Sequence, residues 1–280
     1  MAEYGIFLHV AGRQRAPAGL FEEVCAEAQL AEAVGFSSCL IAEHHQSLEG
    51  HFGAPLVWCA AIAARTTRLK VGPSVLLLPL YHPVHVAEDA AMVDVISGGR
   101  LILGLGIGYQ DVDYAAFGMH PRERVSRMEE GIEIIRRAWT EERFSFHGKR
   151  FDLDNVAVTP KPLQKPHPPI WVGAMSDEGI KRAARQGDGW VADPLKNLAG
   201  LQHLAAIYRD LAGRHGRPAH VAVRRDSWVA PTRKQALEEY SPAVLSAYRY
   251  FWEHGGFRDI LADVVGDQPA PEFSMDDVAR

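Results

Sequence analysis

Strand-like and helix-like segments alternate along almost the whole chain, and this alternation constrains the fold more than any other feature of the sequence. Each short apolar run is followed by a segment whose apolar residues recur every three to four positions, as on one face of a helix. Such a pattern favours parallel strands joined by right-handed crossovers. Seven short strand–helix units therefore predict an α/β fold, a TIM-type barrel. The predicted strands span residues 4–10, 39–42, 69–79, 101–108, 170–173, 190–192 and 221–230.

The two kinds of connection differ in character. Helix-to-strand connections are short and hold no candidate functional residues. Strand-to-helix connections, at 43–45, 80–83, 108–121 and 174–178, carry the histidines, acidic residues and other polar residues that are candidates for function. In a parallel barrel all strand-to-helix connections lie at the C-terminal face, where active sites are built. The exception is a long helix-to-strand stretch, 142–169, which holds five prolines and is interpreted as a structural insertion on the opposite face. The sequence shows no linker and no repeat, so residues 1–280 are expected to form one domain.

Composition excludes several classes of function. The chain has 280 residues and a formal net charge of −5, and its basic residues are scattered, which argues against a nucleic-acid partner. The longest apolar run, residues 75–80, is too short to cross a membrane. The first residues lack the basic segment of a secretory signal. Cys25, Cys39 and Cys59 are interpreted as buried free thiols in a reducing compartment, so the expected location is the cytoplasm.

Two adjacent histidines, His44 and His45, follow Glu43 at the end of the second predicted strand. A histidine at the C-terminal end of a barrel strand is a candidate general acid or base, because it titrates near neutrality. A solvated or packed loop explains the same residues equally well. A metal site is a weaker interpretation, because no predicted strand supplies His-x-His spacing or an Asp–His pair, and no metal is predicted.

The glycines of the fourth predicted strand, Gly104, Gly106 and Gly108, resemble a nucleotide-binding loop only superficially. A dinucleotide fingerprint needs its glycines in the turn between a strand and a helix, whereas these lie within the strand. Alternate glycines instead allow a flat ligand or a neighbouring backbone to approach closely. Ser176 follows the fifth predicted strand and suits a helix N-cap, and the helix start behind it offers N–H groups to an anion.

Five stretches together resemble the bacterial-luciferase-like family of flavin-dependent monooxygenases. They are AEHH at 42–45, VGPSVLLLPLYHPVHVAED at 71–89, SGGRLILGLGIGYQDVDYAAFG at 97–118, RFSFHGKRFDLDNVAVTPKPLQKPHPPIWVGAMS at 143–176 and AARQGDGW at 183–190. The resemblance covers about residues 1–230 in colinear order. It implies a barrel that binds reduced FMN, supplied by a separate flavin reductase, and uses dioxygen to oxygenate a small organic substrate.

The same resemblance assigns roles to individual residues. His44 matches the family's active-site acid or base, and Asp113 matches an acidic residue near the flavin. Ser74 and Val75 match a non-prolyl cis peptide that packs against the flavin ring. Ser176 matches a phosphate contact. The cofactor-binding set is completed by Gly106 and Gly108 of the glycine strand and by Ala174, which directly follows the fifth predicted strand.

The sequence departs from the family pattern at two places. Ile107 stands where luciferase has a phosphate-binding arginine, so phosphate binding would depend on Ser176 and backbone amides. Residues 257–280 form a Pro-rich, acidic tail, so no eighth strand–helix unit is expected there. The uncovered edges of the first and seventh strands, and the apolar helix at 243–252, then predict a homo-oligomer, most simply a dimer. Two alternatives stay open: a deazaflavin-dependent hydride-transferring oxidoreductase, and a non-catalytic flavin-binding or partner subunit.

Overall fold

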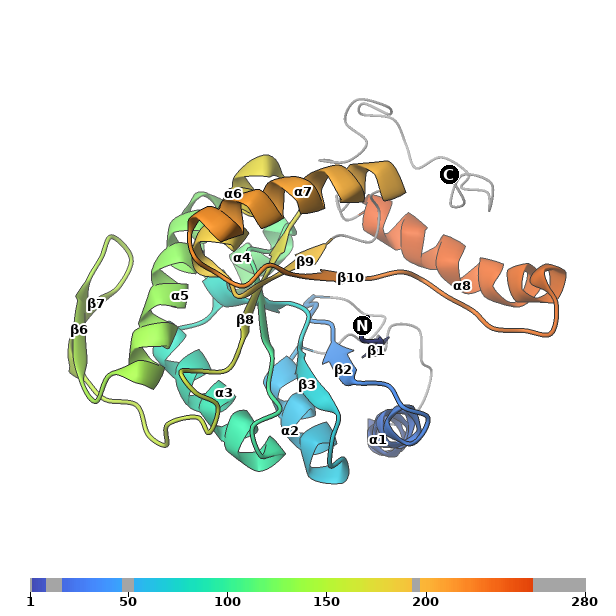
Figure 1. The fold of residues 1–280 in the computed structure, drawn as a ribbon, viewed down its shortest axis with the longest axis horizontal. Helices are drawn as coiled ribbons and strands as arrows, with labels where there is room; N and C mark the ends of the chain where they lie inside the picture. The colour runs from blue at the N-terminus through green and yellow to red at the C-terminus, as the bar shows by residue number, and fades with distance from the viewer. Residues whose placement is uncertain (1, 9–16, 47–52, 193–196, 254–280) are drawn as a thin grey trace.

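The computed structural model describes residues 2–8, 17–46, 53–192 and 197–253, and Figure 1 shows their arrangement. The strands are β1 (Gly5–Leu8), β2 (Ser38–Ile41), β3 (Lys70–Pro73), β4 (Leu76–Leu77), β5 (Leu103–Gly106), β6 (Phe144–His147), β7 (Asp152–Val156), β8 (Ile170–Ala174), β9 (Gly189–Ala192) and β10 (His220–Val223). The α-helices are α1 (Pro17–Ala33), α2 (Pro55–Arg65), α3 (Pro83–Ser97), α4 (Asp111–Ala116), α5 (Arg124–Thr140), α6 (Asp177–Gln186), α7 (Leu198–Arg214) and α8 (Arg233–Glu253). Two 3₁₀ helices, η1 (Leu78–Leu80) and η2 (Pro121–Glu123), complete the elements.

All strands except the β6–β7 hairpin pair in parallel and follow one another in chain order. One sheet has the order β1-β2-β3 and the other the order β10-β9-β8-β5-β4. A parallel bridge between Val71 and Leu101 joins the two sheets. Because β3 and β4 are two halves of one strand, the order gives seven parallel strands with the glycine strand β5 fourth, as predicted. The fold is a TIM-type α/β barrel, with its helices outside the strands (Figure 1).

Alternation along the strands separates two environments. Residues that face the helices are fully buried, as at Ile41, Val71 and Leu103, whereas their strand neighbours include Gly72 and Gly104. This is the pattern expected when strands lie between an outer helical layer and the barrel interior. Cys25, Cys39 and Cys59, expected to be buried free thiols, are indeed buried and unbridged.

The insertion at residues 142–169 carries the β6–β7 hairpin and is fastened to the helices by buried carboxylates. Asp94, at the end of α3, accepts hydrogen bonds from the backbone N–H groups of Leu163 at 2.7 Å and Gln164 at 3.0 Å. The Gln164 amide in turn donates to the Leu101 carbonyl, just before β5, at 2.8 Å. Because Leu101 lies at the N-terminal end of its strand, the insertion contacts the face opposite the strand-to-helix connections, as predicted.

Three boundaries differ from the sequence prediction. The strand predicted at 69–79 is divided, since β3 ends at Pro73 and η1 begins at Leu78. The strand predicted at 221–230 ends at Val223, because Arg224, Arg225 and Asp226 place charges where a buried strand would continue. A short helix, α4, lies in the 108–121 connection, where only a loop was expected. The tail at 257–280, and with it the question of an eighth unit, lies outside the described residues.

The two ends of the strand order approach each other without forming a ladder in the described part of the chain. Arg224, directly after β10, places its guanidinium carbon 4.4 Å from the ring centroid of Phe7 on β1. A cation over an aromatic face is an attractive contact. A side-chain contact therefore links these strands where backbone pairing would otherwise close a barrel.

Candidate active site

Three strand-to-helix connections meet at the C-terminal edge of the parallel strands. They follow β2 at residues 42–46, β4 at η1 and Tyr81, and β5 at α4. Parallel strands in adjacent positions carry their carboxyl ends to the same edge, so residues distant in sequence become neighbours there. Polar side chains from the three connections interact directly.

Glu43 is the centre of this cluster, and its side chain is fully buried. One carboxylate oxygen, Oε2, accepts a hydrogen bond from the backbone N–H of Leu77 at 2.5 Å. The other, Oε1, accepts a short hydrogen bond from the Tyr81 hydroxyl and lies 2.8 Å from Nε2 of His45. A buried carboxylate is tolerated only when its oxygens are paired in this way. Both oxygens of Glu43 are therefore bound by groups of the site.

His45 extends the cluster toward α4. Its ring packs edge-on against Phe117, with 4.8 Å between the ring centroids. Burial opposes protonation of His45, but the hydrogen bond and charge of Glu43, with a smaller contribution from Asp113, raise its pKa above the ordinary value. Burial and the Glu43 carboxylate also raise the pKa of Tyr81. His45 is thus held toward its cationic form and Tyr81 in its neutral form.

The predicted residues His44 and Asp113 lie in the same region. His44 is half-buried and directly precedes His45 in the connection after β2. Asp113 is buried in the first turn of α4 and is close enough for its charge to act on His45. The connections after β2 and β5 therefore bring the two predicted catalytic residues to one side of the barrel mouth.

The connection after β5 is tied back to its own strand. The Tyr114 hydroxyl donates a short hydrogen bond to the carbonyl of Ile107, and burial raises the pKa of Tyr114 to about 12. Gly108 adopts φ +75°, and a Cβ there would lie 2.9 Å from the Tyr114 hydroxyl. Glycine is needed at this position both for the backbone conformation and for the close approach of the ring.

Val75 rests on glycines of two neighbouring strands. The Ser74–Val75 peptide bond is cis, as the resemblance implies. A Cβ placed on Gly106 would lie 2.3 Å from Cγ2 of Val75, and one on Gly173 would lie 3.1 Å from its Cγ1. The predicted cofactor residues Ser74, Val75 and Gly106 are therefore neighbours. The glycines of β5 therefore accommodate the adjacent strand. This is one of the two explanations of the glycines that the sequence allowed, the other being close approach of a flat ligand.

Ser176 caps α6, as predicted, and accepts a hydrogen bond from the N–H of Gly179 at 3.3 Å. Ala174, at the end of β8, is buried, and its carbonyl accepts a hydrogen bond from the Trp190 indole at 2.9 Å. The acidic Glu178 in the first helical turn pairs with Lys181 at 2.6 Å, which offsets its charge. This end of the site can offer a hydroxyl and helix N–H groups to an anion.

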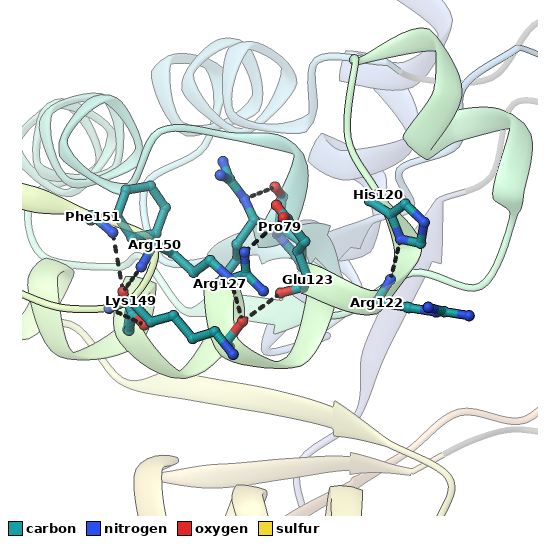
Figure 2. Close-up of polar contacts among 10 residues, drawn as sticks. Pro79, His120, Arg122, Glu123, Arg127, Lys149, Arg150 and Phe151 are labelled. Carbon is teal, nitrogen blue, oxygen red and sulfur yellow. Dashed lines mark hydrogen bonds and ion pairs between the residues drawn. The ribbon is translucent and has the colours of Figure 1, made fainter.

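A cluster of arginines supports η1 from outside the site (Figure 2). Arg127 donates to the carbonyl of Pro79 at 2.8 Å, and its guanidinium carbon lies 4.8 Å from the ring centroid of Phe151. Arg150 pairs with Glu123 at 2.7 Å. Because Tyr81 follows η1 directly, the Arg127 contact fixes the segment that presents the Tyr81 hydroxyl to Glu43.

Sequence reasoning missed part of the polar cluster around Glu43. Glu43 and Tyr81 were not among the predicted site residues, and His45 was considered only as a neighbour of His44. A signal was available: an acid two positions before a histidine at a strand end, with a tyrosine in the next unusual connection. Their interaction depends on the bend of the chain after β4, which residue pattern alone does not specify.

Residues 2–272 match the family described as luciferase-like monooxygenase, and the chain belongs to that family. Monooxygenase RslO1 from Streptomyces bottropensis is structurally similar, with a TM-score of 0.84, 29% sequence identity, and coverage of 94% of this chain and 83% of that one. The membership confirms the predicted family, and the structural similarity agrees with the predicted barrel fold.

Curated relatives include both flavin and deazaflavin enzymes. The F420-dependent glucose-6-phosphate dehydrogenase of Kineococcus radiotolerans is 35% identical over 60% of this chain and 51% of its own length. The oxygenase component of the flavin-dependent trigonelline monooxygenase of Acinetobacter baylyi is 28% identical over 69% of this chain and 54% of its own length. The chain thus spans about half the length of these relatives.

Two further observations concern the described residues as a whole. None of the helices seen there combines the length and apolar character needed to cross a lipid bilayer. In the same residues, no three His, Cys, Asp or Glu side chains converge as a metal ion would require.

Proposed function

We propose that the protein is an FMN-dependent monooxygenase that uses reduced FMN and dioxygen to oxygenate a small organic substrate. The observation that carries the proposal is the juxtaposition, at one barrel mouth, of an acid–base cluster around Glu43 and an apolar surface built by Val75 over two glycines. The names of RslO1 and of the trigonelline oxygenase component support oxygenation as the reaction class.

The residues at the mouth fit a planar, phosphorylated cofactor. Ser74, Val75, Gly106 and Gly108 would border the ring, as the family resemblance implies, with the Val75 side chain packed over Gly106. Ala174 and Ser176 would border the phosphate, where the start of α6 offers N–H groups. Reduced FMN, when bound, would supply the electrons that activate dioxygen. Since Ile107 supplies no charged phosphate contact, we expect reduced FMN to bind in the micromolar range or more weakly.

His44 is proposed to move a proton to or from the reacting groups at its imidazole nitrogens, and Asp113 to contribute an acidic group near the ring. The buried setting of Asp113 and the half-buried setting of His44 suit these roles, because partial exclusion of water strengthens charge interactions. Glu43 and His45 flank His44 in the connection after β2.

The second candidate is a deazaflavin-dependent oxidoreductase that transfers hydride, and the 35% identity to F420-dependent glucose-6-phosphate dehydrogenase favours it specifically. Absorption spectra and mass spectrometry of the cofactor retained by the purified protein separate the two. Binding of reduced FMN, with oxygen-dependent turnover when a flavin reductase is added, is the expected result. Tight binding of deazaflavin F420 with no affinity for FMN would replace the first proposal by the second.

Partners and location belong to the same proposal. We propose a separate flavin reductase, a cytoplasmic location, a single barrel domain and a homodimer. The dimer is supported by the strand order, in which β1 and β10 are end strands with no ladder between them in the described residues. Sedimentation at micromolar concentration tests it, since a stable monomer would contradict the dimer.

A further inference from the structure

Glu43 binds groups from two connections, and the histidine it holds contacts a third. From this arrangement we infer that Glu43 is a positioning residue, which fixes His45 and joins the connections after β2, β4 and β5 into one unit. The inference rests on the proposed function only in that the unit lies at the proposed active site.

The first link reaches the segment that carries Val75. Oε2 of Glu43 accepts the N–H of Leu77, two residues after Val75, at 2.5 Å. A hydrogen bond from a backbone N–H to a buried carboxylate is charge-assisted and stronger than one between neutral groups. The proposed surface under the flavin ring is therefore held from the end of β2 rather than by its own strand alone.

The second link reaches η1. The Tyr81 hydroxyl donates to Oε1 of Glu43, and Arg127 binds the same segment through the carbonyls of Pro79 and Tyr81; the bond to Pro79 is visible in Figure 2. Because the backbone of this segment is held by Arg127, the hydroxyl has little freedom to leave the carboxylate. Tyr81 thereby completes the set of donors on Oε1.

The third link passes through His45 to α4. Nε2 of His45 lies 2.8 Å from Oε1 of Glu43, and the ring packs on Phe117. On the other side, a Cβ on Gly53 would lie 3.4 Å from Nδ1, so a larger residue there would touch the ring. The ionisable groups that face His45 are Glu43 from its own connection and Asp113 from α4, both acidic. Both stabilise its cationic form.

Only a carboxylate satisfies all three donors. A glutamine has one acceptor oxygen and one NH₂ donor, so it cannot accept from Leu77, Tyr81 and His45 together. Glu43→Gln is therefore a near-isosteric change that removes the charge and at least one hydrogen bond. Tyr81→Phe is its matched control, because it removes a bond to the same oxygen and leaves the negative charge in place.

The decisive experiment follows the ring of His45 by nuclear magnetic resonance as pH is varied, on the full chain without added cofactor or substrate. His45→Gln identifies the signal. We expect the pKa of His45 to lie above the ordinary value of about 6.5 in the wild type. This pKa should be lower in Glu43→Gln and should stay raised in Tyr81→Phe. An ordinary or lowered pKa in the wild type, or no response to Glu43→Gln, would overturn the inference. If Glu43→Gln does not fold, the wild-type titration and Glu43→Asp still decide.

Turnover supplies a second readout once a substrate is available. Glu43→Gln should reduce kcat by roughly 10²-fold or more, with KM changed only a few-fold, because orientation and charge at the site are lost while substrate contacts remain. Glu43→Asp should recover part of this loss. A raised wild-type pKa that falls in Glu43→Gln, in a protein that proves to bind F420, would uphold the positioning role while rejecting the monooxygenase proposal.

Discussion

Replacement of Gly106 by alanine tests whether the glycines of β5 serve the neighbouring strand. The added Cβ would lie 2.3 Å from Cγ2 and 3.3 Å from Cβ of Val75, closer than non-bonded carbons tolerate. Valine is stiff about χ1, so Val75 cannot rotate away without moving its backbone. Overpacking of this kind costs about 1–3 kcal/mol, and the usual gain of about 0.4–1 kcal/mol from replacing glycine offsets only part of it. We expect a net loss of about 1–2 kcal/mol in the free energy of unfolding.

Urea unfolding of four proteins measures this effect: the wild type, Gly106→Ala, Val75→Ala and the double variant. Because Val75→Ala removes the methyl group that collides with the new Cβ, the double variant should be more stable than the sum of the single changes predicts. Gly213→Ala is the matched control, since nothing lies within 4 Å of its Cβ position in α7, and it should be neutral or stabilising. Full stability of Gly106→Ala, or strict additivity in the double variant, would refute the packing explanation.

Three other changes probe separate parts of the molecule. His44→Ala should lower turnover by roughly 10²–10⁴-fold and leave flavin affinity nearly unchanged. Steady-state kinetics and a flavin titration measure the two quantities. A loss of flavin affinity alone, with turnover intact at saturation, would make His44 a binding residue only. Asp94→Asn should cost about 1–3 kcal/mol in urea unfolding, because the buried side chain keeps only one acceptor oxygen and brings an NH₂ group against the donors of the insertion. Unchanged stability would contradict the fastening role. His45 has a raised folded-state pKa, so its stabilising contribution is complete below the unfolded value of about 6.5 and disappears as pH rises through the folded value. The stability difference between the wild type and His45→Gln should therefore narrow from pH 6 upward, and a widening difference would reject that sign.

The regular part of the fold could be predicted from the sequence because periodicity and capping are local. Ser176 at the start of α6 and the buried strand β5 are examples. The division of the strand at 69–79 and the helix α4 were missed, because both depend on neighbours distant in sequence. The same reason explains the site: His44 and Asp113 could be named from a resemblance, whereas the role of Glu43 depends on a bend that brings Leu77 and Tyr81 to its carboxylate.

The fastening of the Pro-rich insertion has a consequence for how such a protein can change over evolutionary time. Asp94 and Gln164 consolidate the N-terminal ends of the strands with hydrogen bonds that involve none of the connections at the barrel mouth. The hydrogen bonds that fasten the insertion and the residues of the proposed active site therefore lie on opposite faces of the barrel. In the connections 107–121 and 174–179, positions other than Gly108, Asp113, Tyr114, Ala174 and Ser176 can therefore be substituted while the hydrogen bonds of Asp94 and Gln164 stay intact. Directed evolution of this barrel is best confined to those positions.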